Sequence, residues 1–300
     1  MATILIVVIV LALIFDYING FHDAANSIAT IVSTKVLTPF QAVVWAAFFN
    51  FVAFFIFSDH AVANTVAKTV KPEVVSGTGG IIIILSGLIA SIIWNLFTWW
   101  FGLPSSSSHT LIGGFAGAAI AAAGFNSIDT AMIMKTVIFI FLAPLIGMFI
   151  SIFITLVTIQ KNFWLKIAII AAVVSACMLF IPFKKKKKKW ALLGLSVVFV
   201  TAYFINYFRG ETAARTGRMF KRLQLVSSAV FSIGHGGADA QKVMGIITAA
   251  LIAGGNISEF SQMPDWVPLA CYTAIGIGTM SGGWKIVKTM GTKITKVTPL

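Results

Sequence analysis

Charged residues are scarce in this sequence. Asp, Glu, Lys and Arg together make up 10% of its 300 residues, whereas soluble domains carry about 25%. Hydrophobic residues make up 58%, and the mean hydropathy is +0.96. These values exclude an ordinary soluble globular protein. We therefore expect an all-α, polytopic integral membrane protein with the lipid bilayer as its surroundings.

Acidic residues and cysteines are rarer still. The chain has 9 Asp and Glu against 22 Lys and Arg, for a net charge of +13. The basic residues lie in the gaps between apolar segments, where positive charge orients membrane helices, so nucleic acid is not expected as a partner. The two cysteines, Cys177 and Cys271, lie in apolar runs, which indicates packing rather than redox or metal chemistry.

Apolar runs predict where the chain crosses the bilayer, since a spanning helix needs about 20 residues. Such runs occupy residues 2–18, 39–57, 81–101, 132–159, 163–183 and 190–208. Residues 58–80 are expected to form a polar loop. Shorter apolar runs at 24–36 and 243–253 are expected to be helices that cannot cross the bilayer alone.

Basic residues lie at both ends of the run 190–208. Six lysines at 184–189 predict a cytoplasmic loop by the positive-inside rule. A second basic stretch follows at 209–222, with one acidic residue, Glu211. One full span between two basic loops violates the rule at one of them. Either 190–208 does not cross fully, or 209–222 forms an amphipathic helix at the interface.

Two polar motifs interrupt the apolar sequence in a similar way, at 20–27 and 234–242. Each follows an apolar helix and contains Gly and His, then Asp, then a polar residue, so that Asp23 and Asp239 are equivalent. Short hydrophobic segments broken by glycine at matching positions of two halves point to a transporter binding site. We therefore expect inverted repeats whose broken or re-entrant helices meet near the middle of the membrane.

The repeat divides the chain into three predicted regions: a first repeat at 1–160, central helices with the basic loop at 161–222, and a second repeat at 223–300. A serine-rich motif belongs to the first repeat, with Ser106 lying 83 positions after Asp23. The same step from Asp239 leads to about position 322, beyond Leu300. The second repeat is therefore expected to lack its C-terminal part.

The serine run Ser105–Ser108 follows Pro104 and leads into a segment rich in Gly and Ala. A helix N-terminus exposes free N–H groups and about half a positive charge, which together favour phosphate. Hydroxyl groups add hydrogen-bond donors without adding full charges. One serine suffices to cap a helix, so four in a row indicate an anion site.

Asp23 and Asp239 are carboxylates in membrane-embedded sequence, where a charge is costly unless it has a function and a partner. They cannot attract an anion, but they can bind a coupling Na⁺ or H⁺, or accept a proton from phosphate. The structural alternative is that they hold the helices together through Lys242 or backbone N–H groups. Lys242 itself either contacts phosphate or neutralises Asp239.

Three of the four histidines, His22, His109 and His235, lie in the polar motifs, whereas His60 lies in a loop. The three are expected to hydrogen-bond to the ligating side chains or to handle protons. No metal centre is expected, because no His-x-x-x-His or cysteine pair accompanies them. Asp16, one helical turn before the first motif, is expected to cap a helix or to pair locally.

Three short motifs stand out from the apolar sequence: Gly20-Phe21-His22-Asp23-x-Ala25-Asn26, Pro104-Ser-Ser-Ser-Ser-His109, and His235-Gly236-x-x-Asp239-x-Gln241-Lys242-x-Met244-Gly245. Together they resemble the motifs of the PiT family of inorganic phosphate transporters, and the resemblance covers essentially the whole chain. The family's second serine–threonine motif, Pro-x-Ser-Thr-Thr-His, is expected to lie beyond Leu300.

The resemblance implies a secondary transporter of the bacterial inner membrane that carries inorganic phosphate, or a neutral metal–phosphate complex, with Na⁺ or H⁺. It implies phosphate contacts from Asp23, Asn26, Ser106, Ser107, Ser108 and Asp239, to which the pattern above adds Ser105 and Lys242. It implies coupling-cation contacts from Asp23, Asn26, Asp239 and Gln241. Neither enzymatic activity nor a cofactor is expected. The expected partners are phosphate, the coupling cation, the bilayer and a second copy of the chain.

Two alternatives to a symporter follow from the same residues. Broken helices and small-residue packing also suit an anion-selective channel for phosphate, although paired carboxylates favour coupled transport. An intramembrane hydrolase would need Ser108 and His109 as a catalytic pair, but adjacent residues on a helix do not face each other.

Overall fold

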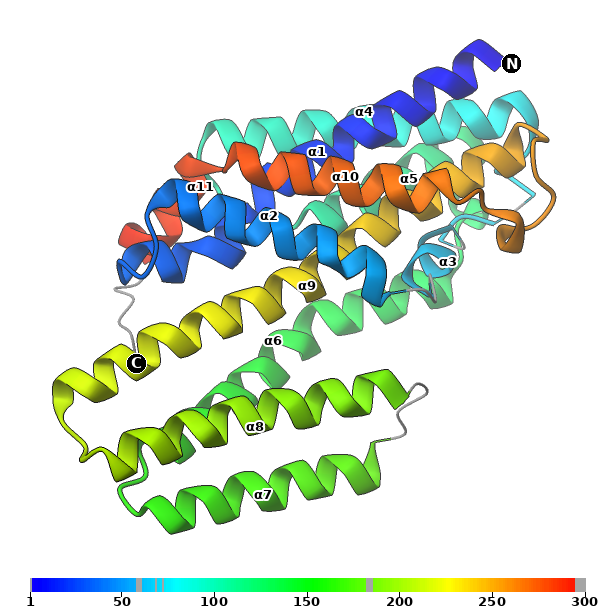
Figure 1. The fold of residues 1–300 in the computed structure, drawn as a ribbon. Helices are drawn as coiled ribbons and strands as arrows, with labels where there is room; N and C mark the ends of the chain where they lie inside the picture. The colour runs from blue at the N-terminus through cyan, green and yellow to red at the C-terminus, as the bar shows by residue number, and fades with distance from the viewer. Residues whose placement is uncertain (1, 58–60, 68, 72, 182–185, 295–300) are drawn as a thin grey trace. The chain divides into compact units, whose positions relative to one another are not determined.

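The computed structural model describes residues 2–57, 61–67, 69–71, 73–181 and 186–294 (Figure 1). Within these ranges the chain is helical, apart from connecting loops and one isolated bridge between Val70 and Ile128. The predicted all-α fold is therefore confirmed. His60 and the two lysines at 184 and 185 lie outside the described residues, so the loops predicted around them are described only in part.

The helices are, in chain order, α1 (Ala2–Ser33), α2 (Pro39–Ile56), α3 (Ala61–Ala67), α4 (Gly77–Trp100), α5 (Ser107–Ala123), α6 (Thr130–Ile159), α7 (Phe163–Phe180), α8 (Lys186–Phe208), α9 (Ala213–Ala253), α10 (Trp266–Ser281) and α11 (Trp284–Lys288). Short 3-10 turns occupy Phe125–Ser127 and Phe260–Gln262, and a π-helical turn occupies Thr289–Ile294.

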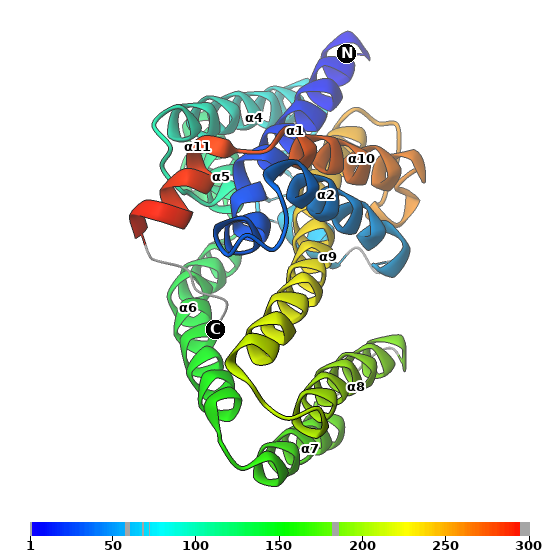
Figure 2. The same ribbon diagram turned by 60° about the vertical axis from the view of Figure 1, so that its left-hand side comes forward.

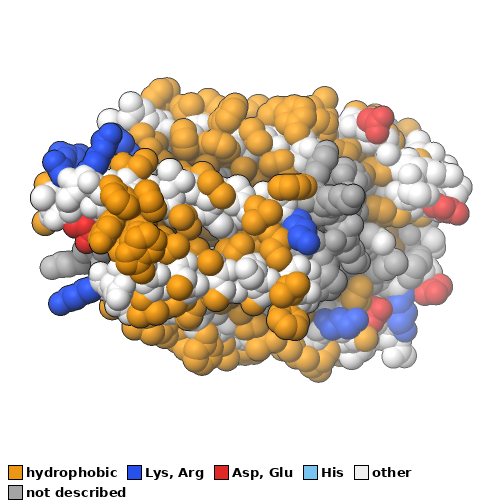
Figure 3. Space-filling model, turned by 60° about the horizontal axis from the view of Figure 1, so that its bottom comes forward, with side chains coloured by type: hydrophobic (Ala, Val, Ile, Leu, Met, Phe, Trp, Pro, Cys, Tyr) orange, Lys and Arg blue, Asp and Glu red, His pale blue; other side chains and the backbone are white. Residues whose placement is uncertain are grey.

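Among the described helices, six are long and apolar enough to cross a membrane: α1, α2, α4, α6, α7 and α8. Each covers most or all of one of the apolar runs that predicted a span. In the space-filling view, hydrophobic side chains cover much of the visible face and charged side chains are few (Figure 3). Both observations agree with an integral membrane protein.

Helices α1 and α9 run without a break through the two polar motifs, so the helix breaks predicted there do not occur. The glycines allow close packing instead. A Cβ atom at Gly20 would lie 2.4 Å from the carbonyl oxygen of Ile275, and one at Gly236 would lie 2.5 Å from that of Asn50. Small residues allow helices to approach closely in lipid, and a glycine inside a helix costs only about 1 kcal/mol.

The serine run lies at a sharp connection between two packed helices. Helix α4 ends at Trp100, Gly102 adopts a left-handed conformation with φ +66°, and α5 begins at Ser107. Helices α4 and α5 then pack so closely that a Cβ atom at Gly114 would lie 2.7 Å from the carbonyl oxygen of Gly87. Because both helices also contact α1, this connection holds the start of α5 near the first polar motif.

The chain forms two compact units. One comprises Met1–Met134 with Gln224–Thr298, and the other consists mainly of Lys135–Leu223. The second unit contains the whole of the predicted central region, 161–222. The predicted division into a first repeat at 1–160 and a second repeat at 223–300 stays a prediction.

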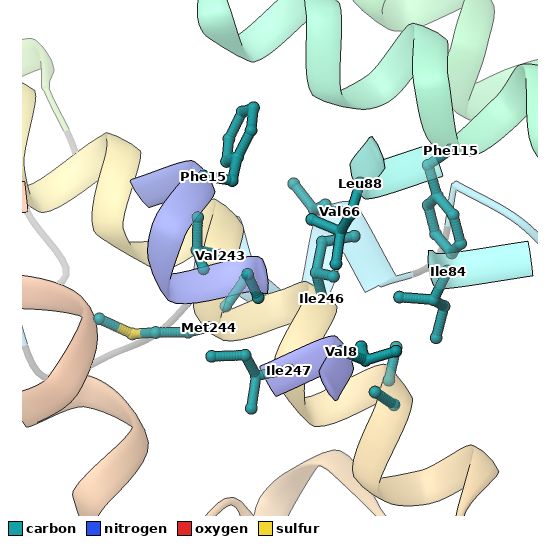
Figure 4. Packing of buried hydrophobic residues seen from close by; sticks show 14 of the residues in the cluster. Val8, Phe15, Val66, Ile84, Leu88, Phe115, Val243, Met244, Ile246 and Ile247 are labelled. Atoms are coloured by element: carbon teal, nitrogen blue, oxygen red, sulfur yellow. The ribbon is translucent and has the colours of Figure 1, made fainter. Parts of the chain in front are cut away.

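The core of the first unit joins the two helices that carry the polar motifs. Helix α1 packs against α2, α4, α10 and α11. Val8 and Phe15 of α1, Leu88 of α4, and Val243 and Ile247 of α9 belong to one buried cluster (Figure 4). Apolar packing after Asp239 and before Asp23 therefore sets how the two motifs meet.

The second unit has a smaller core. Helices α7 and α8 lie side by side (Figures 1 and 2). Phe163, at the start of α7, stacks on Tyr207, near the end of α8, with ring centroids 4.2 Å apart. Tyr203, Met219 and Leu223 complete the buried cluster around Phe163. The basic residues from Arg215 to Arg222 lie in the first turns of α9, which continues to Ala253.

Candidate functional site

Two aspartates from distant parts of the sequence meet where α1 lies against α9. Asp23 and Asp239 are only 7% and 6% exposed. The Nε2 atom of His235 lies 3.4 Å from Oδ2 of Asp239 and 3.9 Å from Oδ2 of Asp23. One ligand atom from each of these three side chains lies within 4.8 Å of the other two, an arrangement that suits a bound cation. The structure thus brings together the two equivalent positions of the predicted repeat.

Lys242 joins this acidic cluster to the serine run. It lies three residues after Asp239 on α9, so both side chains project from the same face of the helix. Its Nζ atom forms an ion pair with Oδ1 of Asp239 and donates a hydrogen bond to Oγ of Ser108. The side chain of Lys242 therefore contacts both Asp239 and the serine run. This position is compatible with both roles considered for it, neutralising Asp239 and contacting the anion.

His22 links the first motif to α4. Its Nδ1 atom lies 3.1 Å from Oδ1 of Asp23, and its Nε2 atom lies 3.0 Å from the hydroxyl oxygen of Thr98. Because a carboxylate only accepts hydrogen bonds, Nδ1 is the donor to Asp23. Ser105 donates a hydrogen bond of 3.1 Å to the same Thr98 oxygen. His22 therefore contacts Asp23, and Thr98 connects His22 to the serine run.

The four serines have different surroundings. Ser106 is the N-cap of α5, because its hydroxyl accepts a hydrogen bond from the His109 backbone N–H at 3.4 Å. Ser105 and Ser108 reach Thr98 and Lys242. Ser107 is fully buried, and its hydroxyl has no hydrogen-bond partner within the described part of the chain. Only one serine is thus used as a cap, and the first turn of α5 faces the acidic cluster through Lys242.

Three predicted site residues do not join this cluster. Asn26 and His109 are exposed. Gln241 is buried, but its side-chain oxygen accepts a hydrogen bond of 3.1 Å from the backbone N–H of Val62 in α3. In this structure Gln241 therefore holds α3 against α9 instead of facing the aspartates.

Sequence reasoning missed Asn19 of α1 and gave Asp16, on the same helix, only a local role. Asn19 donates a hydrogen bond of 3.2 Å to Oδ2 of Asp239, while its own side-chain oxygen has no donor within the described residues. Asp16 lies in the middle of α1, so it caps no helix end, and it is fully buried. The spacing of Asp16, Asn19 and Asp23 places them on one helix face, and this was the signal available in the sequence.

The site has two halves with opposite preferences. Asp23, Asp239 and His235 offer oxygen and nitrogen atoms to a cation. The N-terminus of α5, the hydroxyl of Ser107 and the ammonium group of Lys242 offer N–H, O–H and positive charge to an anion. A cation and an oxyanion bound side by side here would offset each other's charge.

Known proteins that resemble this chain in sequence and in fold are described as phosphate transporters. A model of the phosphate transporter family matches residues 19–300. Proteins described as probable low-affinity inorganic phosphate transporters from Rhizobium meliloti (strain 1021) and Bacillus subtilis (strain 168) are 40% and 39% identical, over 99% and 98% of this chain and 74% of each relative. A solved structure described as "the sodium-dependent phosphate transporter" matches with a TM-score of 0.77 and 27% identity, over 99% of this chain and 80% of that one.

Proposed function

The chain belongs to the phosphate transporter family and is not an enzyme, and we propose that it carries inorganic phosphate across a membrane by symport with Na⁺. The observation that carries this proposal is the side chain of Lys242. It bonds to a carboxylate of the acidic cluster and to a hydroxyl of the serine run at once, so the cation half and the anion half are directly adjacent.

Phosphate would bind at the first turn of α5. Donors there are the free backbone N–H groups, the hydroxyl of Ser107, which has no partner within the described residues, and the hydroxyl of Ser108, which accepts from Lys242 and keeps its own proton. Lys242 supplies a full positive charge. Hydroxyl donors with a single ammonium group select an oxyanion without holding it permanently, which suits a substrate that must also leave.

Coupling would follow from charge. Phosphate is an anion, and the site already contains Asp23 and Asp239. A cation held by these carboxylates removes most of the repulsion, so each ligand increases the affinity for the other, by thermodynamic necessity to the same degree. The match over 99% of the chain to a structure described as sodium-dependent supports Na⁺ rather than H⁺.

Uptake of labelled phosphate into vesicles containing the full-length protein tests this function, with sodium and pH varied independently. We expect uptake to follow an inward sodium gradient at constant pH. Uptake driven by a pH gradient without sodium would assign the coupling to protons. Uptake indifferent to both gradients would point to the second candidate, a channel. Vesicles without protein provide the background.

Three further predictions are more specific than membership of the family. A neutral metal–phosphate complex as the carried species, a homodimer, and the bacterial inner membrane as the location stay predictions. Repeating the uptake assay with and without Mg²⁺ at constant sodium tests the first of these. If the complex is carried, phosphate uptake requires Mg²⁺, and the metal and phosphate enter the vesicles in a fixed ratio.

A further inference from the structure

The second unit contains a cavity with a strong positive charge. Its volume is about 410 Å³, and it lies between the last turns of α8 and the first turns of α9. Four arginines line it: Arg209, Arg215, Arg218 and Arg222. The site proposed for phosphate transport contains none of these residues.

Little in the neighbouring sequence neutralises these arginines. Glu211 is the only acidic residue between Asp129 and Asp239 in the sequence, and within the described residues it forms no ion pair with these arginines. Arg215 donates hydrogen bonds to the backbone carbonyl groups of Arg209 and Gly210, which holds its guanidinium group at the end of α8.

Within the described part of the chain, the other three guanidinium groups form no side-chain ion pair; they belong to Arg209, Arg218 and Arg222. Guanidinium groups bind phosphate through pairs of parallel hydrogen bonds. The charged side of the cavity therefore suits a phosphate group.

The other side of the cavity is apolar. Ile205 of α8 and Met219 and Leu223 of α9 line it, and Met219 and Leu223 are buried. Asn206, which is 7% exposed, donates a hydrogen bond of 3.1 Å to Thr216 and so fastens α8 to α9 beside the cavity. A free phosphate ion would use only the charged side, whereas an amphipathic phosphate ester would use both.

The position of the cavity along α8 agrees with an amphipathic ligand. The apolar span of α8 ends at Phe208, directly before Arg209. Aromatic rings gather at the same end, where Phe163 packs against Phe204 and Tyr207. Aromatic residues concentrate where a membrane meets water, which is the level of lipid headgroups.

We propose that this cavity binds the phosphate group of an anionic phospholipid, with the arginines around the phosphate and the apolar side against the glycerol and upper acyl chain. The proposal gives the second basic stretch a role besides orienting the chain. It also distinguishes the two phosphate-binding regions. One lysine and several hydroxyls allow the transported ion to leave, whereas several unpaired arginines retain a lipid.

The test compares lipid retention by full-length protein purified from vesicles of phosphatidylcholine with a minority of phosphatidylglycerol. Native mass spectrometry measures bound phosphatidylglycerol for the wild type and for Arg218→Gln/Arg222→Gln. Each basic residue near a membrane surface contributes about fivefold to anionic lipid binding, so the double variant should bind about 25-fold more weakly. Lys221→Gln is the matched control, since Lys221 lies between the two arginines in the sequence but does not line the cavity.

Two further measurements identify the ligand and control for misfolding of the variant. Arg218→Lys/Arg222→Lys keeps the charge but not the paired hydrogen bonds, and it should bind the lipid with intermediate affinity. Inorganic phosphate added at the concentration used for uptake should not displace the lipid. Equal retention by the wild type and the Gln variant would overturn the proposal. So would an equal loss in Lys221→Gln, or displacement of the lipid by inorganic phosphate.

Discussion

Asp23 and Asp239 occupy equivalent places in two similar motifs, yet their surroundings differ. Asp239 has an ion pair with Lys242 and accepts a hydrogen bond from Asn19. Within the described residues, the side-chain partners of Asp23 are His22, at 3.1 Å, and His235, at 3.9 Å. Two similar motifs therefore place two carboxylates at one site, but the positive charge next to each carboxylate differs. The lysine compensates Asp239, whereas Asp23 is the more available for a cation.

Replacing either aspartate should have the largest effect on uptake, and phosphate binding should distinguish the two variants. Asp23→Asn removes the carboxylate assigned to the cation, so sodium-driven uptake should fall by on the order of 100-fold, the upper range of coupling between two sites. Phosphate binding measured without sodium should tighten, because one of the two charges that repel phosphate is gone. Asp239→Asn should also abolish coupled uptake, and because it releases Lys242 as well, phosphate binding without sodium should tighten further. Identical behaviour of the two variants in equilibrium binding would remove the distinction.

The next effect concerns the ion pair that makes the two aspartates different. Lys242→Met leaves Asp239 as a buried charge without its partner, which should lower the free energy of unfolding by about 3–5 kcal/mol. Thermal unfolding in detergent measures this loss. The double variant Lys242→Met/Asp239→Asn should recover most of it, because no unpaired charge is left. A double variant no more stable than the single one would show that Lys242 stabilises by packing, not by pairing.

The smallest expected effect lies within the serine run. Ser107→Ala removes a buried hydroxyl that has no partner of its own, so it should weaken phosphate binding by roughly tenfold, equivalent to one hydrogen bond to a charged group, with little change in stability. Ser106→Ala is the matched control. It removes the helix cap and should cost about 1 kcal/mol of stability with phosphate affinity unchanged. If Ser106→Ala weakened phosphate binding as much as Ser107→Ala does, the serine run would act only as a helix cap.

The spans and the polar motifs could be predicted from the sequence because each depends on local composition. The apolar runs at 81–101 and 163–183 became α4 and α7 with small changes at their ends. Gly20 and the glycines of 234–242 were misinterpreted as helix breakers. The distances of Gly20 and Gly236 to neighbouring backbone show why: a glycine that permits close packing and one that interrupts a helix look the same in a single sequence.

Individual contacts at the site could not be predicted in the same way. Gln241 is next to Lys242 in the sequence, yet it faces α3 because successive residues on a helix point about 100° apart. Thr98 lies in an apolar run and became part of the site only because α4 packs against α1. Asn19 was passed over for the same reason, since its partner is on α9.

The sequence by itself determined that this chain is an all-helical membrane protein of a phosphate transporter family, because hydrophobic runs and short polar motifs are properties of neighbouring residues. Only the tertiary structure decided which carboxylate is paired with a lysine, which serine hydroxyl has no partner within the described residues, and where four arginines line one side of a cavity whose other side is apolar. Those features depend on which faces of distant helices pack together, and the packing of the whole core sets that choice.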